Sequence, residues 1–458
     1  MTGFRWTAAA VREALGLGDG AGDADAAYAG VSTDSRTLEA GDLFVALEGD
    51  AFDGHDFVDQ AVAAGARGVV LRRAVDVPDQ VAIYRVEDTL VALGRLARFR
   101  RLALPARVVG ITGSSGKTTT KELLKAAVGT RLRVHANRGN FNNRIGVPLT
   151  LLEAPEDAEV VISEMGTSLP GEIRALVEIG VPDVAILTTV AESHLEGLGT
   201  LQGVLEEKLD LLRGLRPGAV ALAGDEPPIL PDAVRRARPD ARIVGTSDAA
   251  DPADRPEDVR PDTQGRYTFR WHGAAVTLPA PGRHILQDAL LALAAAEALG
   301  VPPEDAARGL AGMESRGMRG EERHIGPVLV VLDCYNANPQ STRAALDTLV
   351  MRAAKGPRIA ILGSMLELGH ETDALHERVL NYALAVGLDR VVATGAFATA
   401  APDRSDPALI RAEDPEDGFR AVQDDLEEGA VVLLKASRGV ALERLLPVME
   451  RALTGEGG

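Results

Sequence analysis

The amino-acid sequence predicts an α/β protein with three domains. The chain has 458 residues, which corresponds to roughly three domains of about 150 residues each. Short apolar segments alternate with segments of helical periodicity, a pattern typical of mostly parallel sheets. A glycine-rich turn joins one apolar segment to a helix, as in a phosphate-binding loop (P-loop). We therefore expect a small N-terminal α/β domain (residues 1–104), a central P-loop domain with a parallel sheet (105–314) and a C-terminal Rossmann-like domain (315–458).

The N-terminal domain is predicted from two apolar segments with a helical segment between them. Residues 41–47 and 68–72 are apolar and strand-like, whereas residues 55–66 have the periodicity of a helix. The segment 98–107 marks the expected boundary with the central domain.

The central domain begins with an apolar strand that runs through the glycine turn into a helix. The strand covers residues 107–113 and the helix covers 117–128. Further strands are expected at 158–164, 184–190 and 219–224, with helices such as 171–180 and 288–300. The polar, proline-rich segment 247–265 is expected to be an exposed loop, and 266–278 a hairpin that turns at His272-Gly273.

The C-terminal domain follows a second boundary near residues 312–320. Four apolar segments are expected to be buried strands with helices between them, at 328–339, 358–363, 390–395 and 430–435. This order predicts a doubly wound sheet.

Composition excludes several classes of protein. The net charge of −18 and an aromatic content of 3% argue against nucleic-acid and anionic-membrane partners. The single cysteine, Cys334, allows no intrachain disulfide and fits a reducing, cytoplasmic location. No apolar run approaches 18 residues, and the N-terminus lacks the apolar core of a secretion signal. We expect a monomer with no nucleic-acid or membrane partner.

The segment GITGSSGKTTT, residues 110–120, resembles a P-loop, although Ile111 stands where the general pattern has its first glycine. The amides of residues 113–118 could surround a polyphosphate at the start of the helix, where free N–H groups and the helix dipole favour anions. Lys117 would neutralise the outer phosphates, and the Thr118 hydroxyl would bind Mg²⁺. Lysine accounts for six of the 49 lysine and arginine residues, so arginine is the usual cation in this chain. A lysine in a motif therefore indicates a position where an amine is needed.

Other candidate residues have ordinary explanations when each is taken alone. Glu164 could be a metal ligand or a solvated strand end, and His194 a metal ligand or a loop histidine. Lys208 could be a surface lysine on an acidic helix. The local pattern leaves these alternatives open.

Several segments together resemble the Mur ligase family, and the resemblance covers nearly the whole chain. The compact loop TGSSGKTTT is typical of that family, and the other segments occur in the family's order and spacing. They are STDSR (32–36), GNFNNRIGVPLTLL (139–152), SEMGTSLPGEI (163–173), SHLEGLGTLQGVLEEK (193–208), PGRH (281–284), DCYNANPQST (333–342), GSMLELG (363–369) and KASRG (435–439).

The resemblance implies a ligase that uses ATP to join a carboxylate to an amine through an acyl phosphate. YNANP and MLELG look like the member that adds D-alanyl-D-alanine to UDP-N-acetylmuramoyl-tripeptide, a peptidoglycan precursor. The N-terminal domain would bind the uridine nucleotide, the central domain ATP, and the C-terminal domain the amine. The implied cofactors are ATP, two Mg²⁺ ions and a carbamylated lysine at Lys208, since a carbamate offers oxygen ligands that arginine cannot form.

The resemblance also implies roles for individual residues. The catalytic residues would be Lys117, Lys208, His194 and Glu164, and the metal ligands Thr118, Glu164, His194 and the Lys208 carbamate. ATP would contact Gly113, Ser114, Ser115, Gly116, Lys117, Thr118, Thr119, His284, Asp288, Arg319 and Asp333. The other substrates would contact Asp34, Ser35, Arg36, Asn140, Asn143, Tyr335, Asn336, Asn338, Lys435 and Arg438.

Some positions depart from the family pattern. Ile285 and Asp288 replace two asparagines near the adenine contact, and Ala436 replaces a glycine. Leu332 and Cys334 replace an acid and a hydroxyl, and Ser364 replaces an acid. The departures at Leu332, Cys334, Ser364 and Asp288 could mark a paralogue that uses a different amine.

Other members and other classes are disfavoured. The ligase that adds diaminopimelate or lysine is less favoured, because the C-terminal domain has no DNPR-like segment. A folyl-polyglutamate ligase is disfavoured because this sequence has STDSR and a full N-terminal domain. A regulator without catalysis is disfavoured by the presence of Lys117, Glu164, His194 and Lys208.

Overall fold

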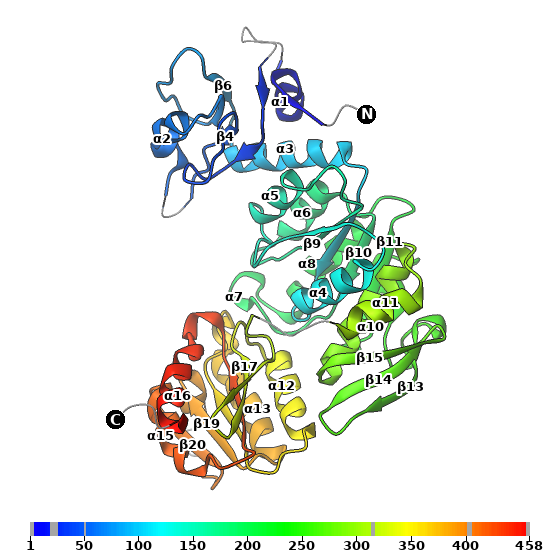
Figure 1. The fold of residues 1–458 in the computed structure, drawn as a ribbon, viewed down its shortest axis with the longest axis vertical. Helices are drawn as coiled ribbons and strands as arrows, with labels where there is room; N and C mark the ends of the chain where they lie inside the picture. The colour runs from blue at the N-terminus through cyan, green and yellow to red at the C-terminus, as the bar shows by residue number, and fades with distance from the viewer. Residues whose placement is uncertain (1–3, 19–25, 50–51, 313–316, 401–404, 455–458) are drawn as a thin grey trace.

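The computed structural model describes all residues except 1–3, 19–25, 50–51, 313–316, 401–404 and 455–458. Figure 1 shows three α/β bodies that follow one another along the long axis in chain order. The predicted three-domain α/β fold is confirmed. Part of the expected boundary at 312–320 lies outside the described residues. No helix in the described ranges is both long and apolar enough to cross a membrane.

The N-terminal domain holds a small parallel sheet and a connecting helix. The sheet order is β3 (Val31–Ser32), β4 (Leu43–Val45), β5 (Gly68–Leu71) and β6 (Ala82–Arg85), and β1 (Trp6–Thr7) pairs with β2 (Ala27–Tyr28). The helices are α1 (Ala8–Leu15), α2 (Val58–Ala63) and α3 (Thr89–Ala103). Helix α3 packs against α1 on one side and against α5 and α6 of the central domain on the other (Figure 1).

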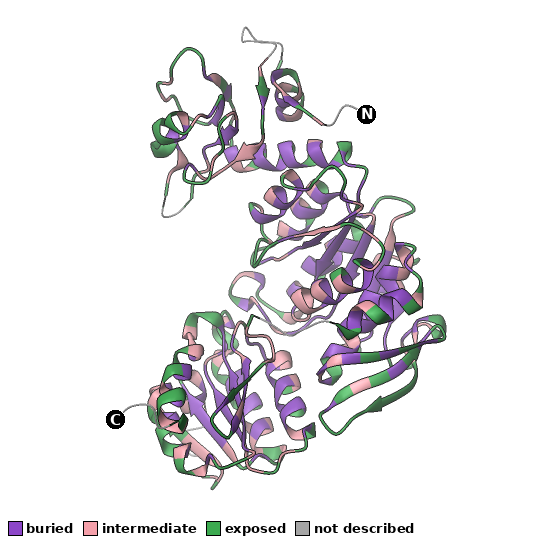
Figure 2. Cartoon of the chain, in the orientation of Figure 1, coloured by how far each residue is buried: buried purple, intermediate pink, exposed green. Residues whose placement is uncertain are grey.

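The central domain is built on a six-stranded parallel sheet of order β12-β11-β10-β7-β9-β8. The strands are β7 (Arg107–Thr112), β8 (Val134–Ala136), β9 (Val160–Glu164), β10 (Val184–Leu187), β11 (Val220–Gly224) and β12 (Arg242–Val244). Helices α5 (Gly146–Leu152), α6 (Glu172–Gly180), α8 (Leu201–Arg213) and α9 (Leu230–Ala237) cover one face. Helices α4 (Lys117–Val128), α10 (Arg283–Ala298) and α11 (Pro303–Ala311) cover the other. The strands other than the edge strand β8 are therefore mostly buried, as their continuous apolar runs predict (Figure 2).

The strand order places the P-loop at a topological switch point. Strand β7 lies between β9 and β10, and the chain leaves its carboxyl end through the glycine turn into α4. Ligands of open α/β sheets bind at the carboxyl ends of the strands at such a point. The sheet therefore positions the loop where a nucleotide would bind.

The predicted hairpin is present, but the preceding segment is not simply a loop. Strands β14 (Arg266–Trp271) and β15 (Ala274–Pro281) turn at His272 and Gly273, whose φ angles of 45° and 89° are both positive, as the tightest hairpin turn requires. Within 247–265, η2 (Pro252–Asp254) and β13 (Glu257–Pro261) form, and β13 pairs with β14. The expectation of a loop there was wrong in this respect. All five residues of β13 are exposed, so no apolar alternation marked the strand.

The C-terminal domain has the four predicted buried strands and two edge strands that were not predicted. The order is β16-β17-β21-β18-β19-β20, with β16 antiparallel to β17 and the other pairs parallel. The strands are β16 (Glu321–Ile325), β17 (Val328–Asp333), β18 (Arg358–Leu362), β19 (Arg390–Thr394), β20 (Leu409–Ala412) and β21 (Val431–Lys435). The main helices are α12 (Pro339–Met351), α13 (Thr372–Ala385), α15 (Pro415–Val422) and α16 (Leu446–Thr454).

Candidate active site

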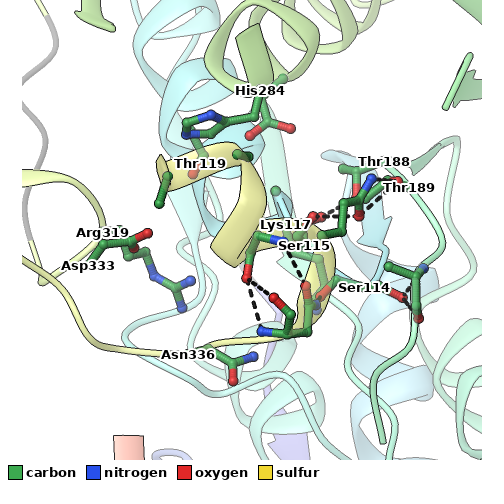
Figure 3. A pocket seen from close by; sticks show the side chains of 18 of the residues that line it. Ser114, Ser115, Lys117, Thr119, Thr188, Thr189, His284, Arg319, Asp333 and Asn336 are labelled. Carbon is green, nitrogen blue, oxygen red and sulfur yellow. Dashed lines mark hydrogen bonds between the residues drawn. The ribbon is translucent and has the colours of Figure 1, made fainter. Parts of the chain in front are cut away.

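A cleft of about 930 Å³ lies between the central and C-terminal domains. The central domain contributes the P-loop, the asparagine-rich segment 140–143, Glu164, His194 and the start of α10. The C-terminal domain contributes Arg319, the end of β17 and one side of α12. Figure 3 shows Lys117 and Ser115 of the loop around the same cavity as Arg319, Asp333 and Asn336.

The P-loop is held tightly by its neighbours. The Ser114 N–H donates to the Thr189 carbonyl (2.9 Å), and the Thr188 hydroxyl donates to the Ser115 carbonyl (2.6 Å). A Cβ atom at Gly113 would lie 1.8 Å from the Thr188 hydroxyl oxygen, so only glycine fits there. This close packing fixes the loop in its anion-binding shape.

Lys117 is half-buried at the centre of the loop. Its Nζ donates to the Gly113 carbonyl at 2.6 Å. Burial lowers the pKa of Lys117 to about 8, although the carboxylate of Glu164 opposes this shift; the charge of Arg319 adds a smaller lowering. A polyphosphate in the cleft would favour the charged amine.

Thr118 and Glu164 form a pair of hard oxygen donors at the ends of α4 and β9. The Thr118 hydroxyl donates to Glu164 Oε2 at 3.1 Å. Lys121 lies on the far side of the carboxylate, with Nζ 3.2 Å from Oε1, and both side chains are buried. Asn137 links them, because its Oδ1 accepts from the Glu164 N–H (2.9 Å) and its carbonyl accepts from Lys121 Nζ (3.2 Å). A hydroxyl next to an oriented carboxylate fits the donor preference of Mg²⁺.

His194 stands at the start of α7 (Leu195–Leu198), on the wall of the cleft. Its Nδ1 lies 2.5 Å from Oε2 of Glu367, which belongs to the C-terminal domain. Thr118, Glu164 and His194 therefore all line one cleft, and their binding of a metal ion stays a prediction.

Lys208 is buried in α8, with only 1% of its surface exposed, which excludes a surface lysine. Burial lowers the pKa of Lys208 well below its ordinary value, and the charge of Lys117 adds to the shift. Among the described residues, none forms a hydrogen bond or ion pair with Lys208, and its neighbour Glu207 is occupied by the N–H groups of Gly171 and Ile173. A neutral amine is the form that reacts with CO₂ to give a carbamate. The carbamate itself remains a prediction.

Comparisons with known proteins agree along the whole chain. Three family models match: "Mur ligase family, catalytic domain" at residues 27–101, "Mur ligase middle domain" at 111–296 and "Mur ligase, glutamate ligase domain" at 318–438. The UDP-N-acetylmuramoyl-tripeptide–D-alanyl-D-alanine ligase of Bacillus subtilis is 38% identical over 91% of this chain and 92% of its own length. That of Escherichia coli is 34% identical over 93% and 95%.

The chain belongs to the Mur ligase family.

Solved structures of this family superpose over most of the Mur ligase chain. A MurF structure from Acinetobacter baumannii gives a TM-score of 0.88 at 29% identity and covers 98% of this chain and 100% of its own. MurF from Thermotoga maritima in complex with ADP gives a TM-score of 0.83 at 31% identity, with 93% and 98% covered.

The residues predicted to contact ATP divide into two groups in this Mur ligase. His284, Arg319 and Asp333 line the cleft; Arg319 lies over the Tyr335 ring at 4.0 Å, and Asp333 pairs with Lys435 at 2.8 Å. Asp288 also lines the cleft, but it is buried against the P-loop: a Cβ at Gly116 would lie 2.3 Å from its Oδ1, and its contact with ATP stays a prediction. Burial raises the pKa of Asp288 well above its ordinary value, which favours the neutral acid beside a phosphate site.

The residues predicted to contact the other substrates are also divided. Asn140, Asn143, Tyr335, Asn336, Asn338 and Lys435 line the cleft. Two of the asparagines also form hydrogen bonds with the backbone. Asn143 Oδ1 accepts from the N–H groups at the start of α5, and Asn338 Nδ2 donates to the Ser114 carbonyl at 3.2 Å.

Four predicted substrate contacts lie outside the cleft between the central and C-terminal domains. Arg438 is not among the residues that line this cleft; its guanidinium pairs with Glu443. Asp34, Ser35 and Arg36 lie in the N-terminal domain, where Asp34 and Arg36 form an exposed ion pair at 2.6 Å. Whether they bind a uridine nucleotide stays a prediction.

The sequence interpretation assigned no role to four residues that shape the site: Lys121, Asn137, Gln340 and Glu367. Lys121 could have been noticed because lysine is rare in this chain. Gln340 Nε2 donates to the Thr189 hydroxyl (2.9 Å) and its Oε1 accepts from Ser115 (3.3 Å), which joins α12 to the P-loop. Gln340 and Glu367 both lie in segments that resemble the family, but nothing in the neighbouring sequence indicates which residues they contact.

Replacing Lys121 with methionine is expected to destabilise the central domain. Glu164 would keep its buried charge but lose its cation, and breaking a buried pair in this way costs about 3–5 kcal/mol. For a domain of about 200 residues, each kcal/mol lowers the melting temperature by about 2–4 °C. Differential scanning calorimetry measures the shift. The matched control is Lys125→Met, an exposed lysine on the same helix, for which little change is expected; equal shifts in the two variants would show that the Lys121–Glu164 pair contributes nothing.

Proposed function

We propose that this Mur ligase uses ATP to add D-alanyl-D-alanine to the carboxylate of UDP-N-acetylmuramoyl-tripeptide, in peptidoglycan precursor synthesis. The supporting observation is the single cleft that brings the P-loop, a Mg²⁺-compatible donor set and the YNANP segment together. The two relatives named above align with more than nine-tenths of the chain. We further infer a cytoplasmic monomer, because the cleft is built from two domains of one chain and both nucleotides are cytoplasmic compounds.

The residues of the cleft have separate tasks in this reaction. The amides of the P-loop and Lys117 bind and neutralise the phosphates, so that the γ-phosphoryl group can move to the substrate carboxylate and form an acyl phosphate. Mg²⁺, when bound, would offset the charge that develops on the phosphates; Thr118, Glu164 and His194 would hold it, with a carbamylated Lys208 serving a second ion. The C-terminal domain would then present the amine that attacks the acyl phosphate, and the shared cleft would exclude water from it.

The departures from the family pattern give little support for a different amine. Leu332 and Cys334 are fully buried in the C-terminal core, and burial raises the pKa of the Cys334 thiol to about 12. The Ser364 hydroxyl accepts from the Ala396 N–H at 2.9 Å and does not line the cleft. Of these four departures only Asp288 reaches the cleft, and it faces the nucleotide loop rather than the amine side.

ADP release is expected to require both the UDP-linked tripeptide and an amine, with D-alanyl-D-alanine a better substrate than any single amino acid. A coupled assay on the purified protein, with each component omitted in turn, measures this requirement. Better turnover with a single amino acid would overturn the dipeptide assignment and leave the ligase class intact. Equal ADP release without the amine would argue against ligation.

A further inference from the structure

A carboxylate from the C-terminal domain contacts a predicted metal ligand of the central domain. Glu367 follows β18, just before η3 (Gly369–Glu371), whereas His194 follows β10. Oε2 of Glu367 lies 2.5 Å from Nδ1 of His194, and this contact holds the pKa of Glu367 below its ordinary value. The carboxylate oxygen therefore lies directly against this ring nitrogen of the imidazole.

Both residues are held in an unfavourable backbone conformation. The φ angles of His194 and Glu367 are 53° and 63°, in the left-handed region that non-glycine residues seldom adopt. Such strain costs about 1–3 kcal/mol at each position and persists only where the surrounding structure enforces it. Here the Glu196 N–H, two residues after His194, donates to the Glu367 carbonyl at 3.4 Å. The backbones of the two domains thus hold the two side chains against each other.

The contact decides which ring nitrogen of His194 is available to bind a metal ion. With Nδ1 facing the carboxylate, Nδ1 carries the proton and Nε2 keeps its lone pair. No described residue forms a hydrogen bond with Nε2, and His194 lines the cleft beside Glu164. Metal-binding histidines commonly donate their second ring nitrogen to a carboxylate, which fixes the tautomer and raises the basicity of the ligand.

We propose that Glu367 is a positioning residue for His194, so that full metal affinity in the central domain requires the C-terminal domain to be docked. The proposal rests on the proposed function only in that His194 is taken as a metal ligand; the identity of the amine does not enter it. Glu367 is exposed, and an exposed ion pair contributes little stability by itself. Its effect is therefore expected on metal binding rather than on folding.

A neighbouring ion pair supplies the matched control. Arg378 of α13 pairs with Glu192 at 2.6 Å, and this pair joins the same two domains next to His194 without touching its imidazole. If Glu367 only holds the domains together, breaking the Arg378–Glu192 pair should have the same effect. If Glu367 orients His194, the two changes should differ.

The test measures Mn²⁺ binding by electron paramagnetic resonance, on the full-length protein with a non-hydrolysable ATP analogue. Glu367→Gln and Glu367→Ala are expected to weaken Mn²⁺ binding by about ten- to hundredfold. Arg378→Gln should stay within about threefold, as for an exposed pair. In ligation assays the Glu367 variants should need more Mg²⁺ for half-maximal rate but recover most of kcat at saturation. Adding His194→Ala to Glu367→Ala should cost less than the sum of the two single changes, because both act on one ligand.

Two results would overturn the proposal. One is Mn²⁺ binding by Glu367→Gln that equals the parent. The other is an equal loss of Mn²⁺ affinity in Arg378→Gln, which would show that the Glu367–His194 contact only holds the two domains together. Melting temperatures identify a variant that fails to fold. If Glu367→Ala fails to fold, the near-isosteric Glu367→Gln still decides the test. Because the assay contains no amine, failure of D-alanyl-D-alanine as a substrate would leave its outcome unchanged.

Discussion

Lys208→Arg is expected to lose at least about a hundredfold in ligation rate, although it keeps a positive charge, because metal-borne charge stabilisation contributes several kcal/mol to such reactions. The parent amine is buried and its pKa is lowered well below the ordinary value, which favours the neutral, nucleophilic form. It can attack CO₂, form an N–C bond and release a proton to give a carbamate. A guanidinium cannot do this and would place a fixed charge near the metal ions. Steady-state ADP release measures the loss, and full activity in Lys208→Arg would refute the carbamate.

Chemical rescue separates a missing carboxylate from a damaged core. Lys208→Ala should be similarly inactive, yet acetate or formate should partly restore it by entering the vacated space. The same acids should not restore Lys208→Arg, whose side chain still fills that space, and bicarbonate should help neither. Since Lys208 is almost fully buried, Lys208→Met serves as the packing control. In the parent protein, ¹³C-labelled bicarbonate should give a carbamate resonance that is absent from all three variants.

Most of the fold could be predicted because the parallel sheets are buried on both faces. Strand β10 is an uninterrupted apolar run, β21 is one up to its last residue, Lys435, and α4 begins and ends at the predicted residues 117 and 128. Edge strands lack this signal. Every residue of β13 is exposed and β16 reads EERHI, so backbone pairing alone makes them strands.

The candidate site was predictable where chemistry lies in one short segment and not where it depends on pairing across domains. The P-loop has a sequence pattern that indicates phosphate binding. Glu164 is indicated less strongly, by an acidic residue at the end of an apolar strand. The partners of Lys121, Gln340 and Glu367 are set by how strands and domains meet, which no local pattern encodes. The contact of Asp288 with Gly116 has the same origin, because it follows from the packing of α10 against α4.

Lys117→Ala is expected to lower ligation by about 10²–10³-fold, the usual cost of removing one group that stabilises developing charge. Lys117 is half-buried and, among the described residues, its hydrogen-bond partner is the Gly113 carbonyl, so little stability should be lost. ADP release at saturating substrates measures the effect, with melting temperature as the check on folding. Lys125→Ala, on the exposed side of the same helix, should leave turnover unchanged. Full turnover in Lys117→Ala would mean that the loop is not the ATP site.

The pH dependence of nucleotide binding gives Lys117 a second signature. Burial lowers its pKa to about 8 in the nucleotide-free protein, so its charge is present below that pH and is lost as the pH rises through it. ATP is fully ionised across this range, and a polyphosphate binds the charged amine more tightly. By linkage, the affinity for a non-hydrolysable ATP analogue should fall by up to about tenfold between about pH 7.5 and about pH 9. Isothermal titration calorimetry should show this fall in the parent and a flat, weaker profile in Lys117→Ala. A flat profile in the parent would place the amine away from the phosphates, because a titrating charge that touches them must alter their binding.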